Sequence, residues 1–158
     1  MANNYLQFSE ALTIETAEER AWVEWHMELP SKAEEVPEEE EETSKVYQEY
    51  LRIAELYEFD DIYSNFDFEW EIEESGDKVS MWIYAEEGGN VSNVATFVQQ
   101  FLRKFHPDKC WSLTWAETCS KMAVGEFSGG AVFVTAEKIE WMGAYDWAQS
   151  MQKEFNGK

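Results

Sequence analysis

The segment from Phe66 to Glu73 constrains the fold of this chain most, because it alternates without interruption between apolar and acidic residues. Alternation with a period of two is typical of a β-strand that packs one face on a core and exposes the other to solvent. A strand with one solvated face is common in antiparallel sheets. The core face would hold Phe66, Phe68, Trp70 and Ile72, and the other face Asp67, Glu69, Glu71 and Glu73.

Hydrophobic patterns on either side of this strand predict seven further elements. The expected helices cover residues 16–29, 44–57, 91–105 and 143–155, and the expected strands cover 78–85, 110–118 and 131–136. The order is α-α-β-β-α-β-β-α, which predicts an α+β fold with a mainly antiparallel four-stranded sheet and helices packed on one side. A length of 158 residues favours a single domain over 1–158. Trp22, Trp25, Trp70, Trp111 and Trp147 all fall on the apolar stripes that we expect to form its core.

The net charge of −21 is concentrated in one half of the chain. Residues 1–87 contain 26 acidic and 5 basic residues, whereas residues 88–158 contain 7 of each. A protein that holds nucleic acid by its phosphates needs a basic surface, so we expect no direct nucleic-acid binding. Seven glutamates, one proline and no apolar periodicity predict that residues 31–42 form a mobile acidic loop.

The lack of targeting signals and the small number of cysteines indicate the compartment. No apolar run approaches the ~18 residues of a membrane span, and the first residues lack the pattern of a signal peptide. Two cysteines, Cys110 and Cys119, are too few for a disulfide framework and are expected to be buried thiols. We therefore expect a cytoplasmic protein without a membrane partner.

Several groups of residues are candidates for binding a partner. The acidic groups are the strand residues Asp67, Glu69, Glu71 and Glu73, the pair Asp60 and Asp61, and the run Glu38, Glu39, Glu40, Glu41 and Glu42. On the neighbouring strand Trp82 and Tyr84 face the same way as the acidic row, and such aromatic side chains often anchor interfaces. Carboxylates on one strand face repeat every ~6.7 Å, so the row is either a solvated outer face or a mimic of a nucleic-acid strand.

The sequence contains few of the motifs that indicate catalysis or metal binding. The EF-hand pattern, zinc-ligand spacing, a P-loop, a dinucleotide fingerprint and a nucleophile elbow are all missing. His26 lies between Trp25 and Met27 on the first predicted helix, where a structural role is expected. We therefore predict no enzyme, no catalytic residue, no metal site and no cofactor.

In size, acidity and lack of catalytic motifs, the chain resembles the anti-CRISPR and antirestriction proteins, small inhibitors of bacterial defence encoded by phages and mobile elements. The stretches Cys110–Cys119 and Gly129–Ala136 also look like a segment of uncharacterised phage and mobile-element proteins. These inhibitors share no common fold, so the resemblance transfers no residue role.

The resemblance implies an inhibitor in the bacterial host cytoplasm that mimics nucleic acid. It would block the basic nucleic-acid-binding groove of a defence nuclease or ribonucleoprotein complex, as a monomer or dimer. The alternative is a non-catalytic acidic interaction module of a phage or mobile element that binds another basic partner.

Overall fold

The computed structural model describes residues 2–59 and 65–157. The chain forms two compact units, which are described separately here. The first unit comprises Met1–Thr13 and Phe68–Lys158, and the second comprises Ile14–Asp67. None of the described helices combines the length and the apolar character that a membrane span requires.

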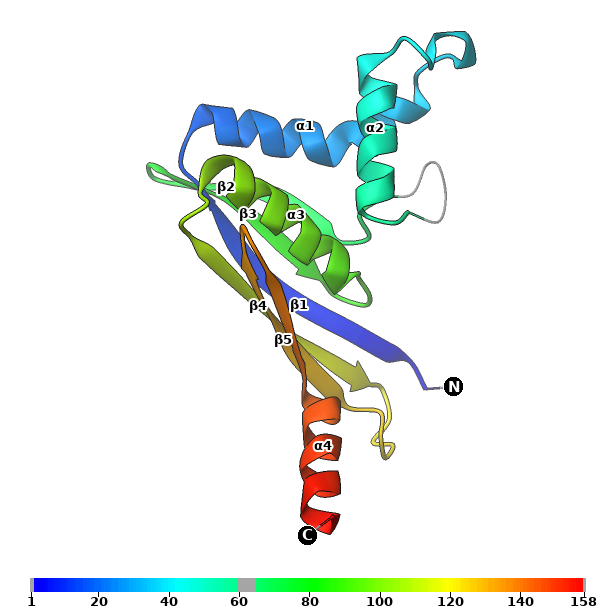
Figure 1. Cartoon of the computed structure of the whole chain (residues 1–158), viewed down its shortest axis with the longest axis vertical. Coiled ribbons are helices and arrows are strands. Elements are labelled where there is room, and N and C mark those ends of the chain that lie inside the picture. The colour runs from blue at the N-terminus through cyan, green and yellow to red at the C-terminus, as the bar shows by residue number, and fades with distance from the viewer. Residues whose placement is uncertain (1, 60–64, 158) are drawn as a thin grey trace. The chain divides into compact units, whose positions relative to one another are not determined.

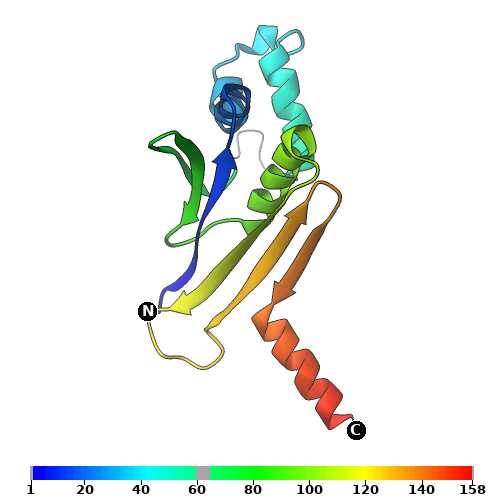
Figure 2. The same ribbon diagram turned by 90° about the vertical axis from the view of Figure 1, so that its left-hand side faces the viewer.

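The first unit is built on one six-stranded antiparallel sheet with strand order β2-β3-β1-β4-β5-β6 (Figures 1 and 2). Its strands are β1 (Asn4–Ile14), β2 (Glu69–Ser75), β3 (Lys78–Ala85), β4 (Cys110–Cys119), β5 (Ser128–Thr135) and β6 (Ile139–Gly143). Over the described residues the whole order is β-α-α-β-β-α-β-β-β-α, with one short 3-10 helix between the first two α-helices. The prediction of a four-stranded sheet in the order α-α-β-β-α-β-β-α is therefore wrong.

The first strand that the sequence pattern did not predict is β1, which lies inside the sheet between β3 and β4. It pairs with β4 in antiparallel register, with Asn4 opposite Cys119 and Phe8 opposite Trp115. Phe8, Leu12 and Ile14 are buried, but the exposed Glu10 interrupts their alternation. This central strand joins the β2–β3 hairpin to the β4–β5–β6 meander.

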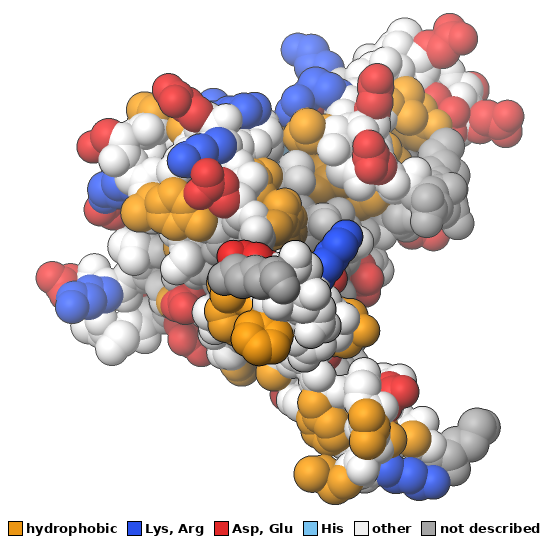
Figure 3. Space-filling view, turned by 60° about the horizontal axis from the view of Figure 1, so that its bottom comes forward, with side chains coloured by type: hydrophobic (Ala, Val, Ile, Leu, Met, Phe, Trp, Pro, Cys, Tyr) orange, Lys and Arg blue, Asp and Glu red, His pale blue; other side chains and the backbone are white. Residues whose placement is uncertain are grey.

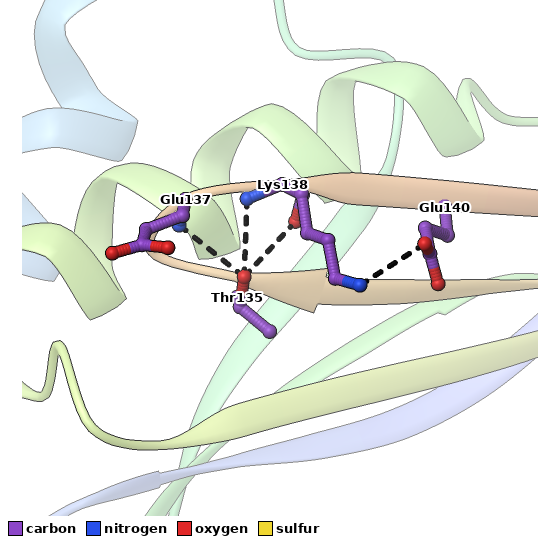
Figure 4. Close-up of polar contacts among 4 residues, drawn as sticks. All are labelled: Thr135, Glu137, Lys138 and Glu140. Atoms are coloured by element: carbon purple, nitrogen blue, oxygen red, sulfur yellow. Dashed lines mark hydrogen bonds and ion pairs between the residues drawn. The ribbon is translucent and has the colours of Figure 1, made fainter.

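The second strand that was not predicted is β6, a five-residue edge strand that follows a tight turn. Figure 4 shows how Thr135 organises this turn: its Oγ1 accepts hydrogen bonds from the backbone N–H groups of Glu137 and Lys138 at 3.2 and 3.0 Å. The Lys138 Nζ lies 3.1 Å from Glu140 Oε1. Five residues are too few for a clear alternation, which explains why the sequence pattern missed this strand.

Helix α3 (Val91–Phe105) covers one face of this sheet (Figure 1). It begins at Asn90, whose side chain accepts a hydrogen bond from the Asn93 N–H at 3.0 Å. The helix contacts β5, and Gln99 Nε2 donates a hydrogen bond to the Thr135 carbonyl oxygen at 3.1 Å. The buried side chains of this core include Phe8, Met81, Ile83, Val94, Phe97, Val98, Phe101, Leu113, Val132 and Val134.

Helix α4 (Ala144–Asn156) continues directly from β6 and buries none of its residues. In Figure 2 it extends beyond the end of the strands. The expectation that Trp147 packs in the core is therefore wrong, and the helices of this unit do not all pack on the sheet. Periodicity identifies an apolar stripe but carries no information about the surface that covers it. Cys110 and Cys119 are not buried either, because they lie at the two ends of β4.

The second unit contains α1 (Ala17–Glu34), a 3-10 helix η1 (Glu38–Glu40) and α2 (Lys45–Leu56). Thr16 and Ser44 begin the two α-helices, and their hydroxyl oxygens accept hydrogen bonds from the N–H groups of Glu19 and Tyr47. The predicted loop over 31–42 is shorter than expected, because α1 continues for one turn past the buried Pro30. A proline removes one helical hydrogen bond but does not always end the helix.

An aromatic cluster surrounds His26 in the second unit. Tyr57 and Phe66 are buried beside the imidazole, and their ring centroids lie 5.9 and 5.4 Å from it. The His26 Nε2 lies 3.0 Å from the Tyr57 hydroxyl oxygen, within hydrogen-bonding distance. This arrangement matches the structural role predicted for His26.

Candidate functional site

The predicted acidic row lies on β2, an edge strand of the sheet. Glu69, Glu71 and Glu73 are exposed, and they alternate with the half-buried Trp70 and Ile72. Alternate residues of a strand point to the same side at ~6.7 Å intervals, so the three carboxylates form a straight row. A charged edge of this kind also resists pairing with a strand of another molecule.

Asp67 does not extend the row. Its φ of 56° lies in the left-handed region, so the extended conformation of β2 begins only at Glu69. The Asp67 N–H donates a hydrogen bond to Asn65 Oδ1 at 2.8 Å, the geometry of an Asx turn. Phe66 belongs to the aromatic cluster of the other unit, although the sequence pattern assigns it to the strand. The predicted row of four carboxylates therefore has three members.

Trp82 and Tyr84 lie beside this row on β3, as the sequence predicts. Glu71 is directly opposite Trp82, and Glu69 is directly opposite Tyr84. Directly opposite residues of an antiparallel pair share one face of the sheet. The two rings stack on each other with centroids 3.8 Å apart and an interplanar angle of 18°. The Trp82 Nε1–H donates a hydrogen bond to Ser9 Oγ on β1 at 2.8 Å, which fixes the indole in place.

Two further glutamates, Glu86 and Glu87, enter the site just after β3. The Leu6 N–H donates to the Glu87 carbonyl oxygen at 3.0 Å, and Gln7 Nε2 donates to the Glu86 carbonyl oxygen at 3.0 Å. These bonds hold the segment against β1. Its side chains line a hollow of about 460 Å³ together with Glu69, Tyr84 and Gly88. Sequence reasoning missed both residues, although they directly follow a strand whose outer face carries the aromatic anchors.

The electrostatic effect of these carboxylates is visible at Tyr84. Desolvation raises the pKa of its phenol, and the negative charges of Glu71, Glu69 and Glu86 raise it further. In the described part of the chain, no lysine or arginine forms an ion pair with Glu69, Glu71 or Glu73. We call this surface the acidic face; it comprises Glu69, Glu71, Glu73, Trp82, Tyr84, Glu86 and Glu87.

Of the other predicted acidic residues, the structure describes only Glu38–Glu42. Glu38–Glu42 belong to the second unit, where Glu38, Glu39 and Glu40 form η1 and all but the half-buried Glu41 are exposed. Asp60 and Asp61 lie outside the described residues. The second unit contains 18 acidic and 4 basic residues, a net charge of −14, whereas the first contains 15 and 8, a net charge of −7. Most of the net charge thus lies on the helical unit, and the acidic face lies on the sheet unit.

The acidic face provides negative charge at fixed intervals beside two stacked rings. Carboxylates bind arginine and lysine side chains, and Trp and Tyr rings bind cations on their faces. The arrangement is therefore suited to a basic protein surface. Comparison of the chain with models of protein families, with curated proteins and with solved structures finds no match.

Proposed function

We propose that the protein is an inhibitor that mimics nucleic acid and occupies the basic nucleic-acid-binding groove of a bacterial defence nuclease complex. The proposal places it in the host cytoplasm, in the functional class of anti-CRISPR and antirestriction proteins. The observation that carries the proposal is the straight carboxylate row of Glu69, Glu71 and Glu73 beside the stacked rings of Trp82 and Tyr84.

The spacing of the row supports mimicry. One strand of DNA carries a phosphate about every 3.4 Å along its axis. Carboxylates at ~6.7 Å intervals are likewise a regular row of negative charges. Lysine and arginine side chains that hold phosphates would pair with Glu69, Glu71 and Glu73 instead.

The ring pair adds a feature that a solvated acidic strand does not need. Bases of single-stranded nucleic acid stack on aromatic or guanidinium planes of their binding proteins. Trp82 and Tyr84 form a rigid stack next to the charges, as bases lie next to a backbone. An arginine of the partner would stack on these rings and pair with Glu69 or Glu71 at the same time.

The second unit would contribute through its net charge. Its net charge of −14 creates a field that attracts a basic groove and accelerates encounter. This contribution is strongly screened by salt, because the Debye length at 0.15 M ionic strength is only about 8 Å. Charge reversal at Glu38–Glu42 should therefore slow association and have little effect on dissociation.

The test is inhibition of purified bacterial nucleases. A panel of RNA-guided nuclease complexes and restriction enzymes is incubated with the chain, and cleavage of target DNA is measured. We expect the chain to inhibit a member of the panel, and DNA added beforehand to prevent inhibition. Binding of the chain and DNA to the same complex at once would contradict the mimic and favour an interaction module of another kind.

A further inference from the structure

Helix α4 exposes a continuous stripe of large apolar side chains. Trp147, Met151 and Phe155 are 61%, 47% and 76% exposed. They are four residues apart, so they lie along one side of the helix. In the space-filling view α4 points towards the viewer near the centre of the picture, and hydrophobic side chains are exposed on its sides (Figure 3). No residue of the helix is buried.

A helix of this length gains little stability from its own sequence. Isolated helices of fewer than about 12–15 residues are marginal in water, and α4 has 13 residues. Its N-cap is Gly143, which offers no side-chain hydrogen bond to the first turn. Only Asp146 in the first turn and Lys153 in the last complement the helix dipole. An apolar surface that covers the stripe would supply the missing stabilisation.

The charges around α4 disfavour two kinds of occupant. The helix carries Asp146, Lys153 and Glu154, and residues 88–158 as a whole have a net charge of zero. A strongly basic partner would find no complementary charge here, in contrast to the acidic face. Helices that lie on anionic membranes have several lysines or arginines on their polar face, and α4 has one.

The stripe is instead complementary to itself. It is symmetric about Met151, with Trp147 four residues before it and Phe155 four residues after it. In an antiparallel pair of such helices related by a two-fold axis at Met151, each Trp147 packs on the Phe155 of the other copy. Interfaces with two-fold symmetry have this reciprocal form. Antiparallel helices also align their dipoles favourably.

We propose that α4 is the interface through which two copies of this chain associate. The exposed parts of Trp147, Met151 and Phe155 amount to about 350 Å² per copy, if each side chain contributes roughly 200 Å² when fully exposed. Pairing would therefore bury about 700 Å² in total, below the ~1,200 Å² of stable interfaces. We expect a weak dimer with a Kd on the order of micromolar.

The dimer and the acidic face respond to salt in opposite directions. Each copy carries a net charge of −21, and salt screens the repulsion between two copies. Higher salt should therefore strengthen the dimer, whereas it should weaken binding of a basic partner to the acidic face. The proposal does not depend on the function of that face.

The test is sedimentation velocity of the full chain from about 1 to 200 µM in low and high salt, a range that spans a micromolar Kd. We expect concentration-dependent dimers, more of them in high salt. Met151→Lys should abolish dimers because it places like charges on the two-fold axis. Gln149→Lys is the matched control: it adds the same charge at an exposed position away from the stripe, on the polar side of α4, and should still form dimers.

A second measurement tests the position of the axis. Met151→Lys and Met151→Glu should each be monomeric alone and should form a mixed dimer when combined, because opposite charges then meet. Circular dichroism confirms that each variant keeps the helix content of the wild type. A wild-type chain that stays monomeric at about 200 µM in high salt would overturn the proposal, and so would equal loss of dimers in Gln149→Lys and Met151→Lys. Either result would leave the stripe to another protein or to a lipid surface.

Discussion

The buried imidazole of His26 should make the stability of the protein depend on pH in a way that one substitution removes. His26 is 2% exposed, and burial lowers its pKa from 6.5 to about 4. The positive charge of Arg52 contributes to this shift, and Glu49 opposes it in part. The folded state therefore holds the imidazole neutral at pH values at which the unfolded chain protonates it.

The sign and size of the effect follow from linkage. Between pH 6.5 and 4 the unfolded state binds more protons at this site than the folded state, so stability falls as the pH falls. The imidazole pKa is 6.5 in the unfolded chain and about 4 in the folded protein. With these values the free energy of unfolding falls by about 1 kcal/mol between pH 7 and 5.5, and by about 3 kcal/mol between pH 7 and 4. Above pH 7 the contribution of this histidine is constant.

The assay is urea unfolding followed by circular dichroism at pH 7, 5.5 and 4, on the wild type and on His26→Gln. The many carboxylates also titrate in this range, but they do so in both proteins and cancel in the difference. We expect the free energy of unfolding of the wild type to fall by about 3 kcal/mol more than that of His26→Gln between pH 7 and 4. Parallel pH profiles of the two proteins would refute a depressed imidazole pKa in the folded state.

Three further substitutions, the first with a control, test the packing of the sheet, the capping of α1 and the extent of the acidic face. Gly130→Ala should cost about 1–3 kcal/mol of stability in urea unfolding, because its Cβ would clash with the Trp115 ring and lie 2.5 Å from the Met142 carbonyl oxygen. Its control Gly88→Ala meets no atom within 4 Å and should be nearly neutral. Thr16→Ala removes the side-chain cap of α1 and should lower the free energy of unfolding by about 1 kcal/mol. Asp67→Asn should leave the affinity for the partner unchanged in a titration, because this carboxylate lies before β2 and outside the row. A loss of affinity as large as that caused by substituting Glu69, Glu71 or Glu73 would show that Asp67 belongs to the binding surface.

Much of the sheet was predictable from the sequence, and the physical basis of the errors is clear. The alternation of Trp70, Ile72 and their acidic neighbours was sufficient to identify β2 and its outer face. The same alternation is present around Phe8, Leu12 and Ile14, but Glu10 interrupts it, and the central strand β1 was missed. Which strand pairs with which is a long-range property, and local periodicity does not contain it.

The candidate site was predictable in part for the same reason. Pairing within a hairpin is local, so Trp82 and Tyr84 could be assigned to the face of the acidic row from the sequence alone. The turn at Asp67 depends on a positive φ, which a pattern of apolar and polar residues does not reveal. Glu86 and Glu87 were missed because hydrogen bonds to Leu6 and Gln7, about 80 residues away, hold them beside the row.

The most direct test of the proposed function is a titration of an inhibited nuclease complex with three forms of the protein. They are the wild type, a row variant with Glu69, Glu71 and Glu73 changed to lysine, and a control variant with Glu137, Glu140 and Glu154 changed to lysine. The two variants have the same net charge, and all six glutamates are exposed and lie in the sheet unit.

Each reversal in the row should cost at least about 1 kcal/mol, so the row variant should bind more than a hundredfold more weakly than the wild type. The control variant should lose only a few-fold, through its weaker long-range attraction. Equal losses in the two variants would contradict the account, because binding would then depend on net charge and not on the acidic face.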